Sequence, residues 1–137
     1  MSLPPEMDVA EGMAFTQSDL IEVRRTPTKG RGVFARVFIP AGTLIEKVPL
    51  ITVTWDHISE SELQHYVYAW TKKQTVVALG YGSLYNHSYT PNARYEDANP
   101  RTKLFFALRD IQPGEEIVVN YNADPNDLSD VGFAVHQ

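Results

Sequence analysis

The sequence contains no cysteine, and this absence excludes several kinds of protein and site. Disulfide scaffolds, thiolate zinc centres and cysteine nucleophiles all need the missing thiol. No apolar run approaches the ~20 residues that a membrane helix requires, and the N-terminus lacks the basic-then-apolar order of a secretory signal. We therefore expect a soluble, intracellular protein that does not bind a membrane.

Histidine is scarce, and known short catalytic motifs are missing. The spacing of the histidines fits no HExxH or similar metal-binding pattern, so we expect no metal site. The G-x-S-x-G elbow of hydrolases and the phosphate-binding P-loop are also absent. The histidines are His57, His65, His87 and His136.

Basic charge is missing from the end of the chain. Residues 110–137 contain six acidic residues and no Lys or Arg, and the whole chain has a net charge of −5. This balance argues against direct binding to nucleic acid. The acidic end has two interpretations: a solvated segment that aids solubility, or a docking surface for a basic partner.

The remaining pattern predicts one mainly β domain. At 137 residues, with 43% hydrophobic residues, the chain can bury a core without covalent cross-links. Short extended runs alternate with turns rich in Gly and Pro, which favours several small sheets with one or two short helices. The extended runs begin at Ile21 and cover residues 33–39, 43–54, 103–108 and 116–121.

One helix start is predicted in the middle of the chain. Ser59 and Glu62 fit a capping box, in which the side chain of each residue accepts a hydrogen bond from the backbone N–H of the other. The apolar residues that follow have helical spacing. They are Leu63, Tyr66, Val67 and Trp70.

Two tight turns share a sequence pattern. Residues 39–45 (IPAGTLI) and 111–117 (IQPGEEI) both place an isoleucine, a proline-containing turn and a glycine before a second isoleucine. Glycine supplies the positive φ that such turns need. We expect each turn to join two strands, with Gly42 and Gly114 in this conformation.

Three segments resemble, in their order, the hallmarks of one family. Residues 29–35 (KGRGVFA) contain a G-x-G turn, residues 80–95 (GYGSLYNHSYTPNARY) an N-H-S-x-x-P-N block, and residues 111–121 (IQPGEEIVVNY) a G-E-E-I-x-x-x-Y ending. Together they resemble the SET domain of protein lysine methyltransferases that use S-adenosylmethionine. The resemblance covers about residues 21–121 and is to the minimal members without flanking cysteine clusters.

The resemblance implies a fold and a division of the chain. It implies the β-clip fold of several short sheets with a C-terminal pseudoknot, which brings the Asn-His pair beside the terminal tyrosine. We expect residues 1–18 to form a flexible N-terminal extension and residues 19–122 the SET domain. Residues 123–137 would be an acidic segment that closes the cofactor and substrate site.

The resemblance also implies a binding site for S-adenosylmethionine. Glycine in the G-x-G turn would let the backbone approach the ligand, and the Asn-His amide and imidazole could fix a purine edge. Taken alone, both segments also fit ordinary polar turns. The expected cofactor-binding residues are Lys29, Gly30, Arg31, Gly32, Asn86, His87, Tyr121 and Phe133.

Tyr121 is the expected catalytic residue. The implied reaction is attack of a neutral lysine amine on a methyl group bound to a sulfonium, and no acid is needed because the departing thioether is neutral. Free lysine has a pKa near ~10.4, so the site must favour its neutral form by desolvation and by nearness to the sulfonium charge. The Tyr121 hydroxyl can orient the methyl group through weak C–H···O contacts. The alternative is a strand-end tyrosine with an exposed hydroxyl.

A channel for the substrate lysine requires aromatic walls, because rings suit both an alkyl stem and a cationic head. Tyr66, Tyr95 and Tyr121 are the expected channel residues. Tyr66 has an equally good alternative as part of the apolar helical stripe. Phe133 has two interpretations: a ring stacked on the adenine of the cofactor, or a residue that only anchors the C-terminal tail.

The chain departs from relatives in how the channel is closed. It has no cysteines after the domain and no second tyrosine after Tyr121. Closure would then come from Val131, Phe133 or a partner subunit, which would allow a homodimer.

Three functions are compatible with these patterns. The leading one is methyl transfer to a lysine of a basic, histone-like protein, in the cytoplasm or at chromatin or a nucleoid. The second is a weak or inactive module of this fold that binds cofactor or basic peptide in a larger complex. The third is a purely structural β-clip domain.

Overall fold

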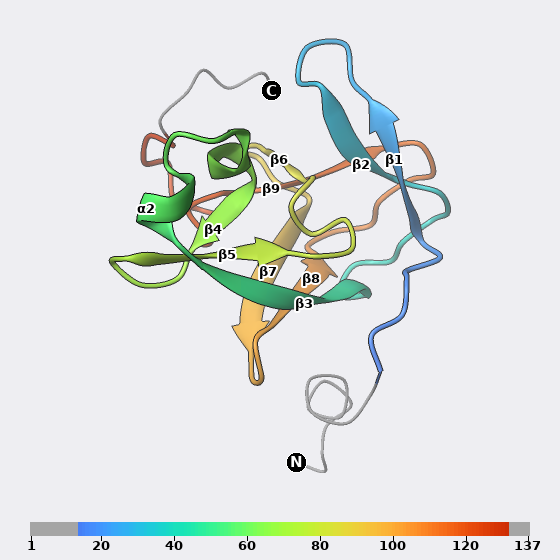
Figure 1. Ribbon diagram of the computed structural model, residues 1–137. Helices are drawn as coiled ribbons and strands as arrows, with labels where there is room; N and C mark the ends of the chain where they lie inside the picture. Colours follow the sequence, from blue (N-terminus) through green and yellow to red (C-terminus); the bar gives the residue numbers. More distant parts are fainter. Residues whose placement is uncertain (1–13, 132–137) are drawn as a thin grey trace.

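The computed structural model describes residues 14–131 as two antiparallel-rich sheets that share one core (Figure 1). The first sheet contains, in spatial order, β1 (Ile21–Arg25), β2 (Arg31–Ala35), β9 (Glu116–Val119) and β6 (Asn86–His87). The second contains β4 (Val67–Ala69), β5 (Gln74–Ala78), β3 (Leu44–Thr54), β8 (Thr102–Ala107) and β7 (Ala93–Ala98). Two short helical segments, α2 (Trp55–Ile58) and the 3-10 helix η1 (Glu62–Tyr66), connect β3 to β4. The predicted mainly β fold is confirmed.

The core lies where the inner faces of the two sheets meet. In β8, between β3 and β7, nearly every residue is buried, because strands cover both of its edges and side chains cover both of its faces. Phe105 is fully buried there, and from the other sheet Val33, Ile117 and Val119 are equally inaccessible. Burial of these side chains is the main force that holds the sheets together. Within residues 14–131, no helix is both long and apolar enough to cross a membrane.

The predicted helix start at Ser59 is wrong. The α-helix ends before this residue: Ser59 is the C-cap of α2, and η1 begins at Glu62 with Ser61 as its N-cap. The helix does not continue, because Val67–Ala69 pairs with β5 as a strand, with Val67 opposite Val77. The β-branched and aromatic side chains at these positions favour a strand once a partner strand is available.

The two glycine turns with matching sequences lie side by side. Gly42 has a φ of +85° and Gly114 a φ of +84°, as their turn pattern predicts. Ile39 and Ile111 form an isolated antiparallel bridge, with N–H···O distances of 2.9 and 2.8 Å. The first turn leads from β2 into β3 and the second from β8 into β9. The chain therefore crosses between the two sheets twice at the same place.

The C-terminal strand is enclosed by segments distant in sequence, as the pseudoknot predicts. β9 pairs antiparallel with β2 on one side and parallel with β6 on the other, where Asn86 lies opposite Val118. Beyond β6 the chain stays beside β9, since the Ser88 N–H donates to the Val119 carbonyl at 2.9 Å. The Asn-His block and the end of β9 are therefore held together directly.

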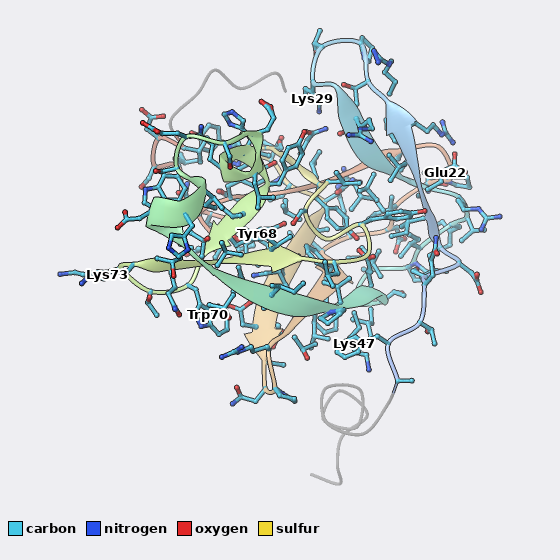
Figure 2. The ribbon with its side chains drawn as sticks, in the orientation of Figure 1. Glu22, Lys29, Lys47, Tyr68, Trp70 and Lys73 are labelled. Carbon is cyan, nitrogen blue, oxygen red and sulfur yellow. The ribbon has the colours of Figure 1, made fainter. Side chains whose placement is uncertain are left out.

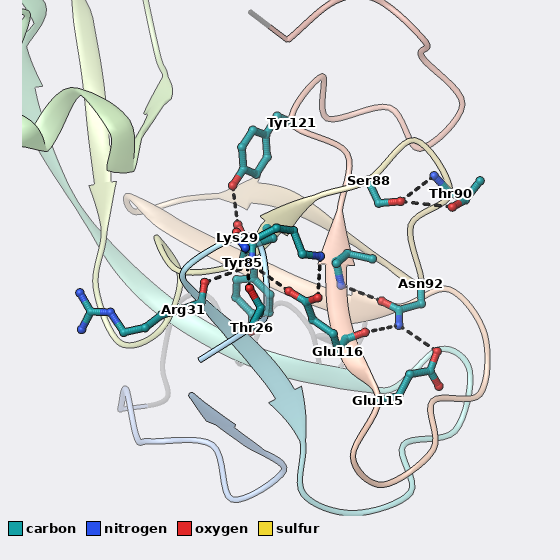
Figure 3. A network of polar contacts seen from close by, with 12 residues as sticks. Thr26, Lys29, Arg31, Tyr85, Ser88, Thr90, Asn92, Glu115, Glu116 and Tyr121 are labelled. Atoms are coloured by element: carbon teal, nitrogen blue, oxygen red, sulfur yellow. Dashed lines mark hydrogen bonds and ion pairs between the residues drawn. The ribbon is translucent and has the colours of Figure 1, made fainter. Parts of the chain in front are cut away.

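Asn92 ties the enclosing segment to β9 (Figure 3). Its side-chain amide donates to the Glu116 carbonyl at 2.8 Å, and its oxygen accepts the Val118 N–H at 2.9 Å. The residue is 1% exposed, so water cannot replace these bonds.

We predict that Asn92→Ala lowers the free energy of unfolding by about 2–4 kcal/mol, because it leaves a buried N–H and a buried carbonyl of β9 without their partner. Urea unfolding measures the loss. The control is Asn126→Ala, at an exposed asparagine, which is expected to leave the urea midpoint unchanged. Equal midpoints for the two variants would contradict this role of Asn92.

Candidate functional site

Tyr121 lies two residues after the end of β9 and is fixed by three hydrogen bonds, of which Figure 3 shows the one to Tyr85. Its hydroxyl donates to the Tyr85 carbonyl at 2.6 Å, and its backbone N–H donates to Nδ1 of His87 at 2.9 Å. Its own carbonyl accepts a hydrogen bond from the Tyr95 hydroxyl at 3.2 Å. The residue is nevertheless 36% exposed, so an anchored phenol remains accessible.

Two cavities meet at Tyr121. The smaller has a volume of about 230 Å³ and the larger about 290 Å³. Tyr121 and Tyr85 line both cavities, together with His65, Tyr66 and Ser83. A group bound in one cavity can therefore contact a group bound in the other beside the Tyr121 hydroxyl.

The smaller cavity contains most of the residues expected to bind the cofactor. Lys29, Gly30, Arg31 and Asn86 line it in addition to the shared residues. Phe133, the remaining aromatic candidate, lies outside the described residues. The G-x-G turn and the Asn-His block are thus brought together, although more than fifty residues separate them in the sequence.

Glu116 on β9 holds this wall in place, and the sequence analysis did not select it. Its carboxylate accepts a hydrogen bond from Lys29 Nζ at 2.6 Å and one from Asn86 Nδ2 at 2.8 Å. Asn86 Nδ2 also donates to the Arg31 carbonyl at 3.1 Å. The only signal in the sequence is the position of Glu116 in the G-E-E-I ending.

Gly32 is not among the residues that line this cavity, and its expected contact with the cofactor stays a prediction. A Cβ atom at this position would lie 2.5 Å from Glu116 Oε2 and 2.8 Å from Asn86 Nδ2. Glycine is therefore needed for the Glu116 and Asn86 side chains to pack behind the turn. Gly30, which does line the cavity, has a φ of +74° and open space around its Cα.

His87 does not line this cavity either, and its expected contact with a purine edge stays a prediction. The side chain is buried, and burial lowers the pKa of His87 below its usual value. Because Nδ1 accepts the Tyr121 N–H, the ring is neutral, with its hydrogen on Nε2. The physical role of His87 is to position the backbone of Tyr121.

The larger cavity is lined by tyrosines, as the expected lysine channel requires. Tyr95 and Tyr121 are predicted members, and Tyr68 is an additional one. The Tyr68 hydroxyl donates to the Gly82 carbonyl at 2.6 Å, and the Tyr68 and Tyr95 rings meet edge to face with centroids 5.1 Å apart. Burial raises the pKa of Tyr95 and of Tyr121 to about 12, so both phenols stay neutral near pH 7.

Tyr66 lies at the junction of the two cavities. It is the last residue of η1 and is 39% exposed, and it lines both cavities. It is therefore not one rung of a packed helical stripe, which was the alternative interpretation.

A buried carboxylate supports the Tyr85 carbonyl from behind. The Tyr85 ring stacks on Phe105 with centroids 4.3 Å apart, and its hydroxyl donates to Glu46 Oε1 at 2.8 Å. Glu46 Oε2 accepts the Tyr81 N–H at 2.9 Å, and burial raises the pKa of Glu46. The burial of Glu46 could not be predicted from sequence alternation, because the register between Leu44 and Glu46 is irregular and breaks the simple alternation of β3.

The segment after Tyr121 folds back beside it. Asn120 Nδ2 donates to the Asp127 carbonyl at 2.6 Å, and Asn122 Nδ2 donates to the Ser129 carbonyl at 2.9 Å. Asn122 and Ala123 line the larger cavity. This part of the expected closing segment therefore forms one rim of the cavity. Val131 is half-buried.

Comparison with known proteins identifies relatives over most of this region. The family model of the SET domain matches residues 30–122. A Schizosaccharomyces pombe protein named histone-lysine N-methyltransferase, H3 lysine-37 specific, is 36% identical over 106 residues, which are 74% of this chain and 72% of that protein. The Drosophila melanogaster histone-lysine N-methyltransferase Set2 is 30% identical over 113 residues, which are 72% of this chain but 5% of that protein.

A solved structure shares the fold. The crystal structure of a candidate histone methyltransferase from Plasmodium falciparum aligns with a TM-score of 0.64 and 31% identity. The alignment covers 77% of this chain and 94% of that chain.

We predict that stability falls as the pH drops below 6.5 and that His87→Gln removes much of this dependence. Because burial lowers the pKa of His87 from 6.5, the unfolded chain binds the proton more tightly. The contribution of His87 to the free energy of unfolding is therefore complete above pH 6.5 and is lost as the pH falls towards the lowered pKa. The raised pKa of Glu46 has the opposite effect, since it increases stability as the pH falls, but wild type and His87→Gln share this effect.

Urea midpoints at about pH 7.5 and pH 5.5 measure this effect. His57→Gln is the matched control, because His57 is exposed in α2. If wild type and His87→Gln lost stability in parallel over this interval, His87 would not be the titrating group.

Proposed function

The chain belongs to the SET domain family, and from this membership we propose that it is a protein-lysine N-methyltransferase that uses S-adenosylmethionine. The observation that carries the proposal is the junction of two cavities at Tyr121. One cavity has the charged and amide groups that suit an amino-acid ligand, and the other has the tyrosine walls that suit a lysine side chain.

The smaller cavity fits the methyl donor by its chemistry. Lys29 and Arg31 provide positive charge for a carboxylate. Asn86 contributes an amide to the same wall. We propose that these residues hold the amino-acid end of S-adenosylmethionine, which supplies an activated methyl group on a positively charged sulfur when bound.

The groups around Tyr121 position the acceptor amine. The Tyr121 hydroxyl and the Tyr85 carbonyl place two oxygens where the cavities meet. Such oxygens can orient a methyl group through weak C–H···O contacts. Because the Tyr121 phenol is neutral near pH 7, it contributes no negative charge that would stabilise a protonated amine. Positioning of this kind can supply several kcal/mol of a bimolecular barrier, on the order of 7–11 at best.

We propose a basic, histone-like protein as the substrate. The names of the relatives specify lysines of histone H3, and histones are rich in Lys and Arg. Asp124, Asp127 and Asp130 come soon after Asn122 and Ala123, which line the larger cavity, in a stretch without basic residues. Negative charge in this stretch would attract a basic segment and increase its rate of encounter. Residues 123–137 would then close the site over the bound segment.

We predict that labelled S-adenosylmethionine transfers label to lysine of histone H3 and that Tyr121→Phe reduces this transfer by about ten- to a hundredfold. The expected loss corresponds to one hydrogen bond to a fixed partner, at about 1.4 kcal/mol per tenfold. Scintillation counting followed by mass spectrometry of the modified lysine measures it.

The matched control is Tyr81→Phe, because Tyr81 bonds to Gln17 away from the two cavities. It is expected to keep wild-type transfer. Bound cofactor without transfer to any protein in a broad basic panel would instead favour the alternative of an inactive binding module.

We predict that Arg31→Gln weakens binding of S-adenosylhomocysteine by about tenfold, since it removes one charged contact to a carboxylate. Binding to the native state raises the melting temperature, so a thermal-shift titration measures the affinity. Arg25→Gln is the control: Arg25 lies in the same hairpin but does not line the cavity. Equal weakening by both variants would indicate general charge and not a direct contact.

A further inference from the structure

A lysine of the protein itself lies in the wall of the proposed lysine channel. Lys103 on β8 stands directly opposite Asp97 on β7, and its Nζ lies 2.7 Å from Asp97 Oδ1. The same Nζ lies 4.3 Å from the ring centroid of Tyr68 and 4.3 Å from that of Tyr95. All four residues line the larger cavity. Burial lowers the pKa of Lys103, and the Asp97 carboxylate counteracts this shift. The channel wall therefore contains an amine of the protein itself, held between two of the tyrosines and paired with a carboxylate.

This ion pair is screened unequally by water. The Lys103 side chain is 1% exposed, whereas the Asp97 side chain is 43% exposed. Water reduces the field of the carboxylate much more than the field of the buried ammonium. The pair thus presents its positive end to the interior of the cavity and its negative end to the solvent.

Lys103 also occupies the ring faces that would otherwise attract a substrate cation. An aromatic face stabilises a cation by its quadrupole, and the faces of Tyr68 and Tyr95 already do this for Lys103. In contrast, the Asp97 carboxylate faces solvent, with its side chain 43% exposed, and further acidic residues follow the cavity residues Tyr121, Asn122 and Ala123 in the sequence. Attraction for a basic segment is therefore strongest outside and weakest inside.

The other titratable groups around Lys103 do not supply a compensating anion to the channel. Burial keeps the Tyr68 pKa well above its usual value, and Tyr95 and Tyr121 are neutral near pH 7. Glu46, on the neighbouring β3, accepts hydrogen bonds from the Tyr85 hydroxyl and the Tyr81 N–H and does not line this cavity. His65 of η1 lines the rim and is exposed.

We propose that Lys103 selects the neutral form of the substrate lysine, by repelling an ammonium group from the inner part of the channel. The inference rests on the proposed function and adds a residue that sets the protonation state of the acceptor. An ammonium group drawn to the mouth by Asp97 releases its proton to solvent there, and the neutral amine moves inward. A like charge nearby disfavours the charged form of an amine, which is the physical basis of the selection.

The test is the pH dependence of methyl transfer at saturating histone H3, because Lys103 acts only on the lysine that is bound in the channel. Rate constants rise with pH until the acceptor lysine is neutral, and this acidic limb reports the pKa of the bound lysine. We expect Lys103→Met and Lys103→Gln to move the limb to higher pH by about one unit, which is about tenfold in rate below the limb. Gln retains a donor for Asp97, so it serves if the Met variant does not fold.

Matched controls separate charge from structure. Lys73→Met removes one lysine at an exposed turn far from the channel and is expected to leave the limb in place (Figure 2). Lys103→Arg retains the charge and should also retain the limb. Asp97→Asn breaks the same ion pair but removes the anion, so it must not move the limb to higher pH.

The outcomes distinguish this inference from the proposed function. The proposal is supported if the acidic limb of the pH–rate profile moves to higher pH in Lys103→Met and Lys103→Gln but in none of the controls. If wild type is active but the limb of Lys103→Gln stays in place, the role of Lys103 is overturned and the proposed function stands. The same conclusion follows if the limb of Asp97→Asn moves to higher pH by an equal amount. No transfer by wild type at any pH overturns both. Thermal shifts with S-adenosylhomocysteine confirm that each variant is folded.

Discussion

The hydrogen bonds between residues 86–92 and the end of β9 are the constraint on which the site depends. Asn92 bonds to two backbone groups of β9, and His87 bonds to the N–H of Tyr121. These contacts join segments about thirty residues apart and enclose β9 between β2 and β6. Without them, Tyr121 would lie at the end of a short strand with nothing to orient its phenol. The same contacts bring Asn86 beside the glycine turn at residues 29–32.

This constraint produces a site whose two halves differ in charge. The half near Lys29 has cations and a carboxylate in close pairs, whereas the half near Tyr95 has neutral phenols around one buried ammonium. Tyr121 lies between the two halves and lines both cavities. Asp97 is the one acidic residue among the described residues that line the larger cavity, and its side chain is 43% exposed. Under the proposed function, this arrangement would attract a basic chain to the surface, while the interior would favour an uncharged amine.

Sequence patterns predicted the strands better than the contacts between them. The extended runs at 43–54, 103–108 and 116–121 correspond closely to β3, β8 and β9, because they are rich in the apolar residues that these strands bury. The motifs also located Tyr121 and the G-x-G turn. Periodicity failed after Ser59, where pairing with β5 overrides helical spacing. The pairing of Lys103 with Asp97 depends on the register of β7 and β8, and no pattern within either strand specifies it.

The junction at Tyr121 is tested most directly by a crystal structure of the chain with S-adenosylhomocysteine and a lysine-containing histone H3 peptide. We predict that the nucleoside amino acid lies against Lys29, Arg31 and Asn86, and that the lysine enters between Tyr95 and Tyr121. The sulfur and the amine nitrogen would then face each other beside the Tyr121 hydroxyl. Ligands bound in other places, or both on the same side of Tyr121, would contradict the assignment.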